Sequence, residues 1–435
     1  MASLLLCALS WSASWRQPVA PRGRQAEPWG GATCSLRSRA VTLRVERNAV
    51  LGRRLEPRQL TNALSKARCG EDLLDLYAHH ADDFNHVHVS AFWSRLGKLV
   101  RSNASERLWI GSSHGAFDQI RNHTEHTVAL QPPRTLSNTA WGIAVSGFRQ
   151  SRAWDSTWEA VSHASRKKCA EFVPQNLANV AWSFATAGYA APQLFEAFSM
   201  ETRRRLAALD AMRLRQASDY VLRDAALVES VYKQNVFSSQ GYANIAWAFA
   251  TAGERSPELF DAIAAEALRD LRAFHMQGLT NLAWAFATAG HESPVLLRAI
   301  GDEMASRIDE SVPQGLAISS WTFATVGEQA PRLFDAIAAE AVSRGIERFK
   351  TQGVANLAWA FASAAHPAPE LFAAIAADAP RRLKHFRGQG IANVAWAFAK
   401  AGVAAPILFE EIALELRSRQ GELTSQVERV VPLSP

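Results

Sequence analysis

The chain has few of the residues that build cross-linked, metal-binding or membrane-spanning proteins. Four cysteines occur among 435 residues, and no two form a Cys-x-x-Cys pair, which argues against a zinc finger or a disulfide framework. The apolar run at 4–9 is far shorter than a helix needs to cross a membrane. Phosphate-binding loops, dinucleotide motifs and kinase motifs are also absent. The sequence therefore predicts no metal, no cofactor and no membrane span.

Two short patterns have the form of catalytic or metal sites. Gly-Ser-Ser-His-Gly at 111–115 matches a nucleophile elbow, but that motif requires a strand–turn–helix inside an α/β domain. The histidines and aspartates of 79–88 could bind a metal, yet Asp-Asp-Phe-Asn at 82–85 is typical of a turn, and no HExxH or matching Cys spacing accompanies it. We therefore expect a protein that is not an enzyme.

The formal net charge of +6 is unevenly distributed. Residues 1–55 hold nine arginines and two acids, so the remaining chain has 47 − 9 = 38 basic and 41 − 2 = 39 acidic residues. A short apolar start followed by an arginine-rich, acid-poor stretch is typical of an organelle-targeting leader. We expect residues 1–50 to be a leader and linker that direct the protein to a chloroplast or other plastid. A mitochondrial leader, or an N-terminus without any address, is the alternative.

The most informative feature is a tryptophan that recurs at nearly constant spacing. The last five of seven copies are separated by 37, 37, 38 and 37 residues. Each lies in a version of one phrase, as in QGYANIAWAFATAG (240–253) and QGLTNLAWAFATAG (277–290). A fixed period of this length indicates a repeat array, whose stacked units form an extended binding surface. We number the repeats one to seven by their tryptophans, Trp141, Trp182, Trp247, Trp284, Trp321, Trp359 and Trp396.

The tryptophan segment of each repeat has the pattern of an amphipathic helix. With the tryptophan as position 0, apolar residues fall at −5, −2 and +2, for example Tyr242, Ile245 and Phe249, and form one stripe. A glycine at +6 would end this helix in the left-handed conformation. The sixth repeat has Ala365 followed by His366 and Pro367 at this place, so we expect a different turn there.

A second helix is predicted to open at a proline ten residues after each tryptophan, because proline fits the first helical turn. These prolines are Pro192, Pro257, Pro294, Pro331, Pro369 and Pro406. The predicted fold is therefore all-α, a right-handed α-solenoid of helix-turn-helix repeats with a period of about 37–38 residues. Residues 51–133 read as degenerate N-terminal helical repeats, 134–420 as the array and 421–435 as a tail. The insertion at about 200–235 predicts a lengthened second helix or an extra helical hairpin.

The phrase Gln-x-Leu-x-Asn-x-x-Trp-Ala-x-Ala-x-x-Gly, with its proline and period, resembles the octotricopeptide-repeat family, which is similar to the repeat regions of FAST-kinase-like proteins. The resemblance covers residues 134–420, and the fifth repeat departs from it with Ile318-Ser319-Ser320 in place of Asn-Leu-Ala. It implies binding of organellar RNA in support of transcript stability, processing or translation. Other RNA-processing or translation proteins would then be partners.

Positions −7, −3, 0 and +4 form a polar stripe roughly opposite the apolar one. Amides and an aromatic ring suit the bases of single-stranded RNA. The candidate RNA-binding residues are Gln240, Asn244, Thr251, Gln277, Asn281 and Thr288, with Ser363 and Lys400 at positions that vary between repeats. The tryptophans at position 0 either stack with bases or pack between repeats, and the asparagines leave the same two interpretations open. These tryptophans are Trp182, Trp247, Trp284, Trp321, Trp359 and Trp396.

Cations gather where each second helix ends, and stacked repeats would align them along one edge. The densest group is Arg381, Arg382, Lys384 and Arg387. Phosphate contacts require such cations, although the same residues could simply complement helix dipoles. The sequence thus predicts a non-catalytic, sequence-selective binder of single-stranded RNA. The alternative is a protein–protein interaction scaffold built on the same solenoid.

Overall fold

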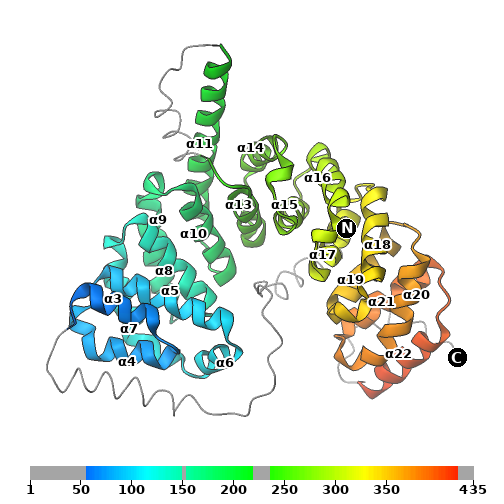
Figure 1. Ribbon diagram of the computed structural model, residues 1–435, viewed down its shortest axis with the longest axis horizontal. Coiled ribbons are helices and arrows are strands. Elements are labelled where there is room, and N and C mark those ends of the chain that lie inside the picture. Colours follow the sequence, from blue (N-terminus) through cyan, green and yellow to red (C-terminus); the bar gives the residue numbers. More distant parts are fainter. Residues whose placement is uncertain (1–54, 149–152, 219–235, 420–435) are drawn as a thin grey trace. The chain divides into compact units, whose positions relative to one another are not determined.

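The computed structural model of the chain describes residues 55–148, 153–218 and 236–419. Every regular element in these ranges is an α-helix or a short 3-10 helix, and no strand occurs among them. Helices pack mainly against their neighbours in the repeat order (Figure 1). The prediction of an all-α solenoid is therefore confirmed.

The chain forms two compact units, Met1–Leu259 and Phe260–Pro435, so that the division falls within the third repeat. The boundary predicted at residue 134 marks where the recognisable sequence repeats begin. It does not mark a division between compact units. Each unit is a solenoid segment with its own two layers of helices.

In the first unit, one layer consists of α3 (Pro57–Lys66), α5 (His86–Ser102), α8 (Pro133–Val145), α10 (Pro174–Ala187) and α13 (Ser239–Ala252). Successive members of this layer pack directly on one another. The remaining helices are α4 (Gly70–His80), α6 (Ala104–Ser112), α7 (Asp118–Thr127), α9 (Asp155–Lys167) and α11 (Pro192–Ser218). Among these, α7, α9 and α11 follow one another as a second layer.

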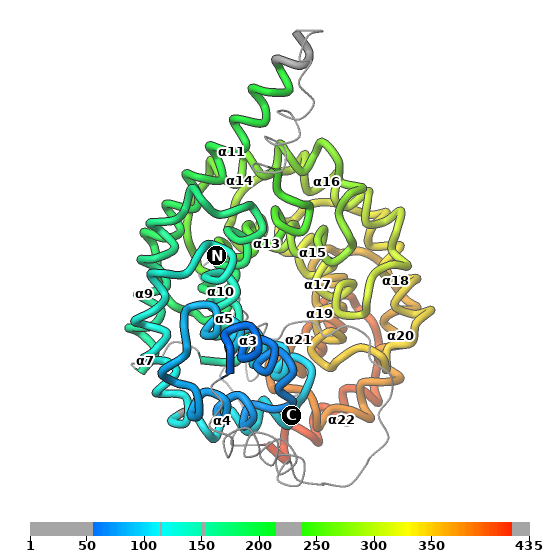
Figure 2. The backbone as a smooth tube through the Cα atoms, turned by 60° about the vertical axis from the view of Figure 1, so that its left-hand side comes forward, coloured from blue at the N-terminus to red at the C-terminus, as the bar shows by residue number. Residues whose placement is uncertain are grey.

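In the second unit, the tryptophan helices are α15 (Met276–Ala289), α17 (Pro313–Val326), α19 (Thr351–Ser363) and α21 (Gly388–Ala401). They lie on the inner side of the unit's own curve (Figure 2). The outer layer consists of α16 (Pro294–Ser306), α18 (Pro331–Arg344), α20 (Pro369–Asp378) and α22 (Pro406–Ser418). The helix α14 (Pro257–Ala267) spans the boundary between the units.

Where the connection is described, short 3-10 turns lead from the second-layer and outer helices to the next tryptophan helix. They are η3 (Val128–Leu130), η4 (Cys169–Glu171), η5 (Leu271–Ala273), η6 (Ile308–Glu310), η7 (Ile346–Arg348) and η8 (Ala379–His385). A buried phenylalanine follows several of them, including Phe274, Phe349 and Phe386. The packing of this ring anchors the start of the next helix, which the sequence pattern did not predict.

The apolar stripe of the tryptophan helices forms the core, as expected. Tyr242, Ile245 and Phe249 are 5%, 1% and 1% exposed. The outer helices begin at the predicted prolines in all six repeats. A proline has no N–H, and at the first helical position none is needed, so the outer helix can start without loss of a hydrogen bond.

The glycines at +6 adopt the left-handed conformation that their position predicts. Gly290, for example, has φ of 63° and its N–H bonds to the carbonyl of Ala287 at 3.2 Å. The expectation of a different turn at the sixth repeat is wrong. Ala365 has φ of 52°, its N–H bonds to Ala362 O at 3.3 Å, and His366 N–H bonds to Phe361 O at 3.0 Å. Alanine therefore adopts the same turn, in a conformation that its Cβ disfavours.

Several predictions concern other parts of the chain. The insertion begins as a lengthened second helix, since α11 continues to Ser218. Its remainder, the leader at 1–50 and the tail at 421–435 lie outside the described residues. The Gly-Ser-Ser-His-Gly segment runs from the end of α6 into the 3-10 helix His114–Phe117. No strand precedes it in the described chain, so the elbow geometry is missing there.

Candidate nucleic-acid interface

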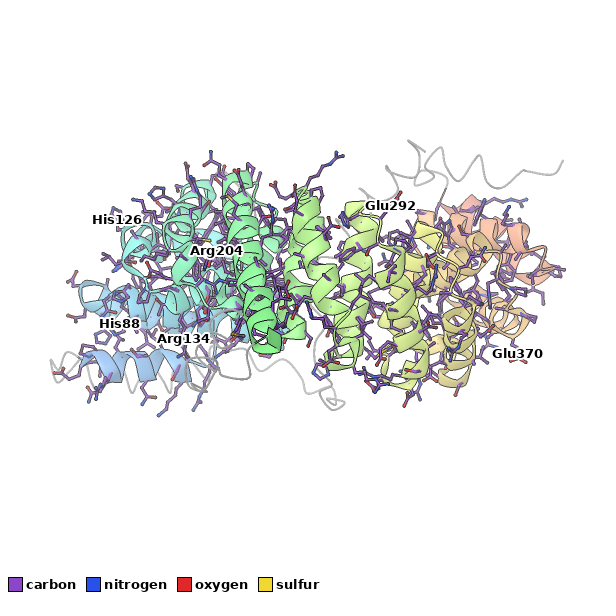
Figure 3. The ribbon with its side chains drawn as sticks, turned by 90° about the horizontal axis from the view of Figure 1, so that it is seen from above. His88, His126, Arg134, Arg204, Glu292 and Glu370 are labelled. Atoms are coloured by element: carbon purple, nitrogen blue, oxygen red, sulfur yellow. The ribbon has the colours of Figure 1, made fainter. Side chains whose placement is uncertain are left out.

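The polar stripe lies on the solvent side of the tryptophan layer. Gln240 and Gln277 at position −7 are exposed, and Asn244 and Asn281 at position −3 are half-buried. The first repeat has Arg134 in place of the glutamine, also exposed (Figure 3). At position +4, Thr251 and Thr288 are half-buried, whereas Ser363 and Lys400 are exposed. The candidate side chains on this stripe are therefore reachable from solvent to different extents.

The tryptophans pack on one another between adjacent repeats. Trp182 stacks on Trp247 in the first unit, and Trp359 stacks on Trp396 in the second. Both pairs have ring centroids 6.3 Å apart and planes at 28°, which is within the range of offset-stacked aromatic pairs. The packed ring faces support a structural role for these four side chains. Trp284 is only 9% exposed, and Trp321 is half-buried.

The asparagines at position −3 behave differently. Asn356 is 1% exposed, and neither its Nδ2 nor its Oδ1 has a hydrogen-bond partner within the described residues. No hydrogen bond joins the other side chains at this position to any described residue. We call these six amides the amide positions: Asn138, Asn179 and Asn244 in the first unit, and Asn281, Asn356 and Asn393 in the second.

Hydroxyl groups at position +4 are also unpartnered in three repeats. The Oγ1 atoms of Thr186, Thr251 and Thr288 are buried, and no described group bonds to them. A threonine within a helix commonly donates to the carbonyl four residues earlier. These three hydroxyls do not make that bond, so their hydrogen-bonding capacity is unused in the structure.

Arginines of the second-layer and outer helices, or of the turns that follow them, form a repeated inter-repeat contact that we call the arginine clamp. Each pairs with a carboxylate four residues earlier and donates to backbone carbonyls of the preceding turn. Arg382, for example, pairs with Asp378 and donates to Phe349 O at 2.8 Å. The five clamp pairs are Glu201–Arg205, Glu303–Arg307, Glu340–Arg344, Asp378–Arg382 and Glu415–Arg419.

The electrostatics of the clamp are clearest at Glu201, which is 7% exposed. Burial by itself would raise the pKa of this carboxyl, but hydrogen bonds from Arg204 and Arg205 outweigh it and hold the pKa below its ordinary value. The guanidinium of Arg205 also reaches Ala170 O at 3.2 Å. The clamp is thus a charged contact that also satisfies backbone carbonyls.

The clamp divides the candidate phosphate-binding cations into two kinds. Arg382 is engaged in the clamp, with its side chain 21% exposed. Arg381, Lys384 and Arg387 are exposed, and so are Arg348 and Lys350 on the preceding turn. The two turns adjoin, because Thr351 Oγ1 donates to His385 O at 3.2 Å. We call these five exposed cations the basic edge.

The clamp was missed at the sequence level, although a signal exists. An acid and an arginine four residues apart recur with the repeat period, at Arg307, Arg344, Arg382 and Arg419. Such pairs resemble ordinary intrahelical ion pairs, which stabilise exposed helices only slightly. The bonds to carbonyls 33 to 36 residues earlier, as from Arg382 to Phe349 and Ile346, depend on how repeats stack.

Potential metal ligands do not gather in the described part of the chain. No cluster of three or more potential metal ligands occurs among the residues searched. Burial raises the pKa of the Cys169 thiol to about 12, so this sulfur stays protonated and is a poor nucleophile. Among the described helices, none has the length and apolar character needed to cross a membrane. Comparison with known proteins gives no match, neither to a family model nor to a curated sequence.

Proposed function

We propose that this chain binds single-stranded RNA with sequence selectivity and performs no chemistry on it. The observation that carries the proposal is the set of unpartnered amide positions on the tryptophan helices, five of which are half-buried and one of which, Asn356, is buried. Bases would face the five half-buried amides, and phosphates would contact the basic edge.

One of the amide positions, Asn356, is a buried amide without a partner, and such a group is costly. A buried polar group without a hydrogen bond costs about 1–3 kcal/mol, and Asn356 has two such atoms. A side-chain amide both donates and accepts, which matches the edges of unpaired bases. Recurrence at one position per repeat fits a ligand with its own regular spacing, such as a single strand. The stacked tryptophans would then hold neighbouring amides in register.

The basic edge gives the phosphate backbone a place to bind. Lys350 and Arg387 are the N-cap residues of α19 and α21, and neither helix start has a side-chain cap. The backbone N–H groups and the dipole at a helix start favour anions. The exposed cations beside them add the salt-dependent attraction on which RNA binding depends.

The proposed cellular role follows from the resemblance of the repeats. The protein would act in a plastid, with a mitochondrion as the alternative, and support the stability, processing or translation of a transcript. Its further partners would be RNA-processing or translation proteins. A protein-interaction scaffold on the same surface is the competing function.

The test compares variants of the folded chain for binding to a randomised pool of single-stranded RNA. Replacing Arg381, Lys384 and Arg387 together with glutamine should weaken binding to all sequences. It should also flatten the slope of log affinity against log salt by about 2, at about 0.7 per lost phosphate contact. Arg382 is retained because its guanidinium holds the clamp.

A matched control removes three exposed arginines from the outer helices, Arg203, Arg298 and Arg332. This variant loses the same charge but should keep the wild-type salt slope. Equal effects of the two triple variants would refute the basic edge as the contact. Absence of RNA binding by the folded wild-type chain at low salt would refute the proposed function and favour the scaffold.

A further inference from the structure

The fifth repeat lacks an amide at the position where the other repeats have one. Its helix α17 has Ile318 at position −3, and this side chain is half-buried like Asn281 in the fourth repeat. Isoleucine offers no donor or acceptor. The stripe of the second unit therefore has an apolar step between Asn281 and Asn356.

The hydroxyl of the fifth repeat is also committed. Thr325 Oγ1 donates to Trp321 O at 2.8 Å, so its proton already takes part in a bond within the helix. The equivalent hydroxyls of Thr251 and Thr288 have no such partner. The fifth repeat thus lacks the amide of the other repeats, and its hydroxyl is already engaged.

The turn that leads into α17 differs in charge as well. Asp309 and Glu310 are exposed on this turn, and Arg307 is held by carboxylates of Glu303 and Glu310. The N-cap of α17 is Val312, 41% exposed, where α19 and α21 have Lys350 and Arg387. Phosphates would meet acids and an apolar side chain here.

We propose that the fifth repeat is an unread step, over which a nucleotide lies without discrimination of its base. This inference rests on the proposed function and deepens it. The nucleotide would contact Ile318 by van der Waals packing, which every base can make. Acids on the preceding turn would keep its phosphate away. The recognised sequence would then consist of two selective parts separated by one tolerant position.

The experiment selects bound RNAs from a randomised single-stranded pool and reads base frequencies at each position. The wild-type chain should give an internal position with nearly equal frequencies, flanked by selective ones. Ile318→Asn should create a preference of about fivefold at that position alone, which corresponds to about 1 kcal/mol. The matched control Asn281→Ile should abolish preference at the adjacent position instead.

The outcomes separate the inference from the function on which it rests. If the folded wild-type chain binds no single-stranded RNA, both the proposed function and the unread step are overturned. Binding of a protein through Val312 and Ile318 would then favour the scaffold function. RNA selected without a tolerant internal position overturns the unread step and leaves the proposed function standing. Circular dichroism tests whether Ile318→Asn is folded. If this variant does not fold, the base frequencies selected by the wild-type chain alone test the unread step. A folded Ile318→Asn with the wild-type profile also overturns the assignment.

Discussion

The sixth-repeat turn allows a sharp test of how this chain ends its helices. Ala365 is the non-glycine residue that the described chain holds at positive φ, at 52°. A left-handed residue with a Cβ costs about 1–2 kcal/mol. Glycine avoids that cost but loses about 0.4–1 kcal/mol through the greater freedom of the unfolded chain. Ala365→Gly should therefore stabilise the protein by about 0.5–1 kcal/mol.

Gly290 provides the reverse change at the equivalent turn. A Cβ built there would have no neighbour within 4 Å, so substitution tests backbone strain without a steric clash. Gly290→Ala should destabilise by about 0.5–1 kcal/mol, and the β-branched Gly290→Val by about 1–2 kcal/mol. Because the two turns belong to different repeats, the double variant Ala365→Gly/Gly290→Ala should return close to wild-type stability.

The measurement is urea unfolding followed by far-ultraviolet circular dichroism. The midpoint should rise for Ala365→Gly and fall for Gly290→Val, while the dependence of the unfolding free energy on urea stays unchanged. A midpoint for Ala365→Gly at or below that of the wild type would refute the left-handed turn at 365. An unchanged midpoint for Gly290→Val would refute the glycine cap.

Three other outcomes can be checked. Arg382→Ala should destabilise the protein by about 2 kcal/mol in urea unfolding, because a charged donor to several carbonyls is lost. Arg382→Lys should recover only part of this stability, because lysine lacks the forked guanidinium. Equal stability of Arg382→Lys and the wild-type protein would contradict the forked contact. Since Glu201 has a lowered folded-state pKa, its contribution is complete above the ordinary carboxyl pKa and disappears as pH falls through the folded value. Glu201→Gln should thus be less stable at neutral pH and lose less on acidification, and parallel pH profiles would oppose this. N-terminal sequencing of the protein from cells should begin between about residue 16 and residue 60, and an intact Met1 would reject the leader.

Local signals were sufficient to predict where most helices of the repeat array begin and end. The prolines that open outer helices and the glycines that end tryptophan helices act through their own backbone restrictions, so their positions translate directly into helix boundaries. The failure at Ala365 has the same origin. The turn there is held by hydrogen bonds from Ala365 and His366 to the preceding helix, and His366 also bonds to Asp335 at 2.8 Å. Contacts from the neighbouring repeat thus override a local preference.

The candidate site was only partly predictable, because burial and pairing depend on stacking. The sequence placed the polar stripe opposite the apolar stripe that the structure buries. It could not separate tryptophans that pack from asparagines that have no partner. That distinction requires the geometry of adjacent helices, as in the Trp359–Trp396 pair. Likewise, Arg381 and Arg382 are neighbours in sequence, but only the second reaches the carbonyls of the preceding turn.

The direction of the arginine clamp sets the order in which the contacts between repeats can form during synthesis. Each guanidinium reaches backward along the chain, so a turn receives its donor only after the next repeat has been synthesised. Arg419, the C-cap residue of α22, donates to Leu383 O and Phe386 O. During synthesis on a ribosome, the clamp contacts would therefore form from the N-terminus toward the C-terminus. The repeat synthesised last would still lack its donor. Deleting α22 would leave these two carbonyls without their donor, so the array is easier to shorten from its beginning than from its end.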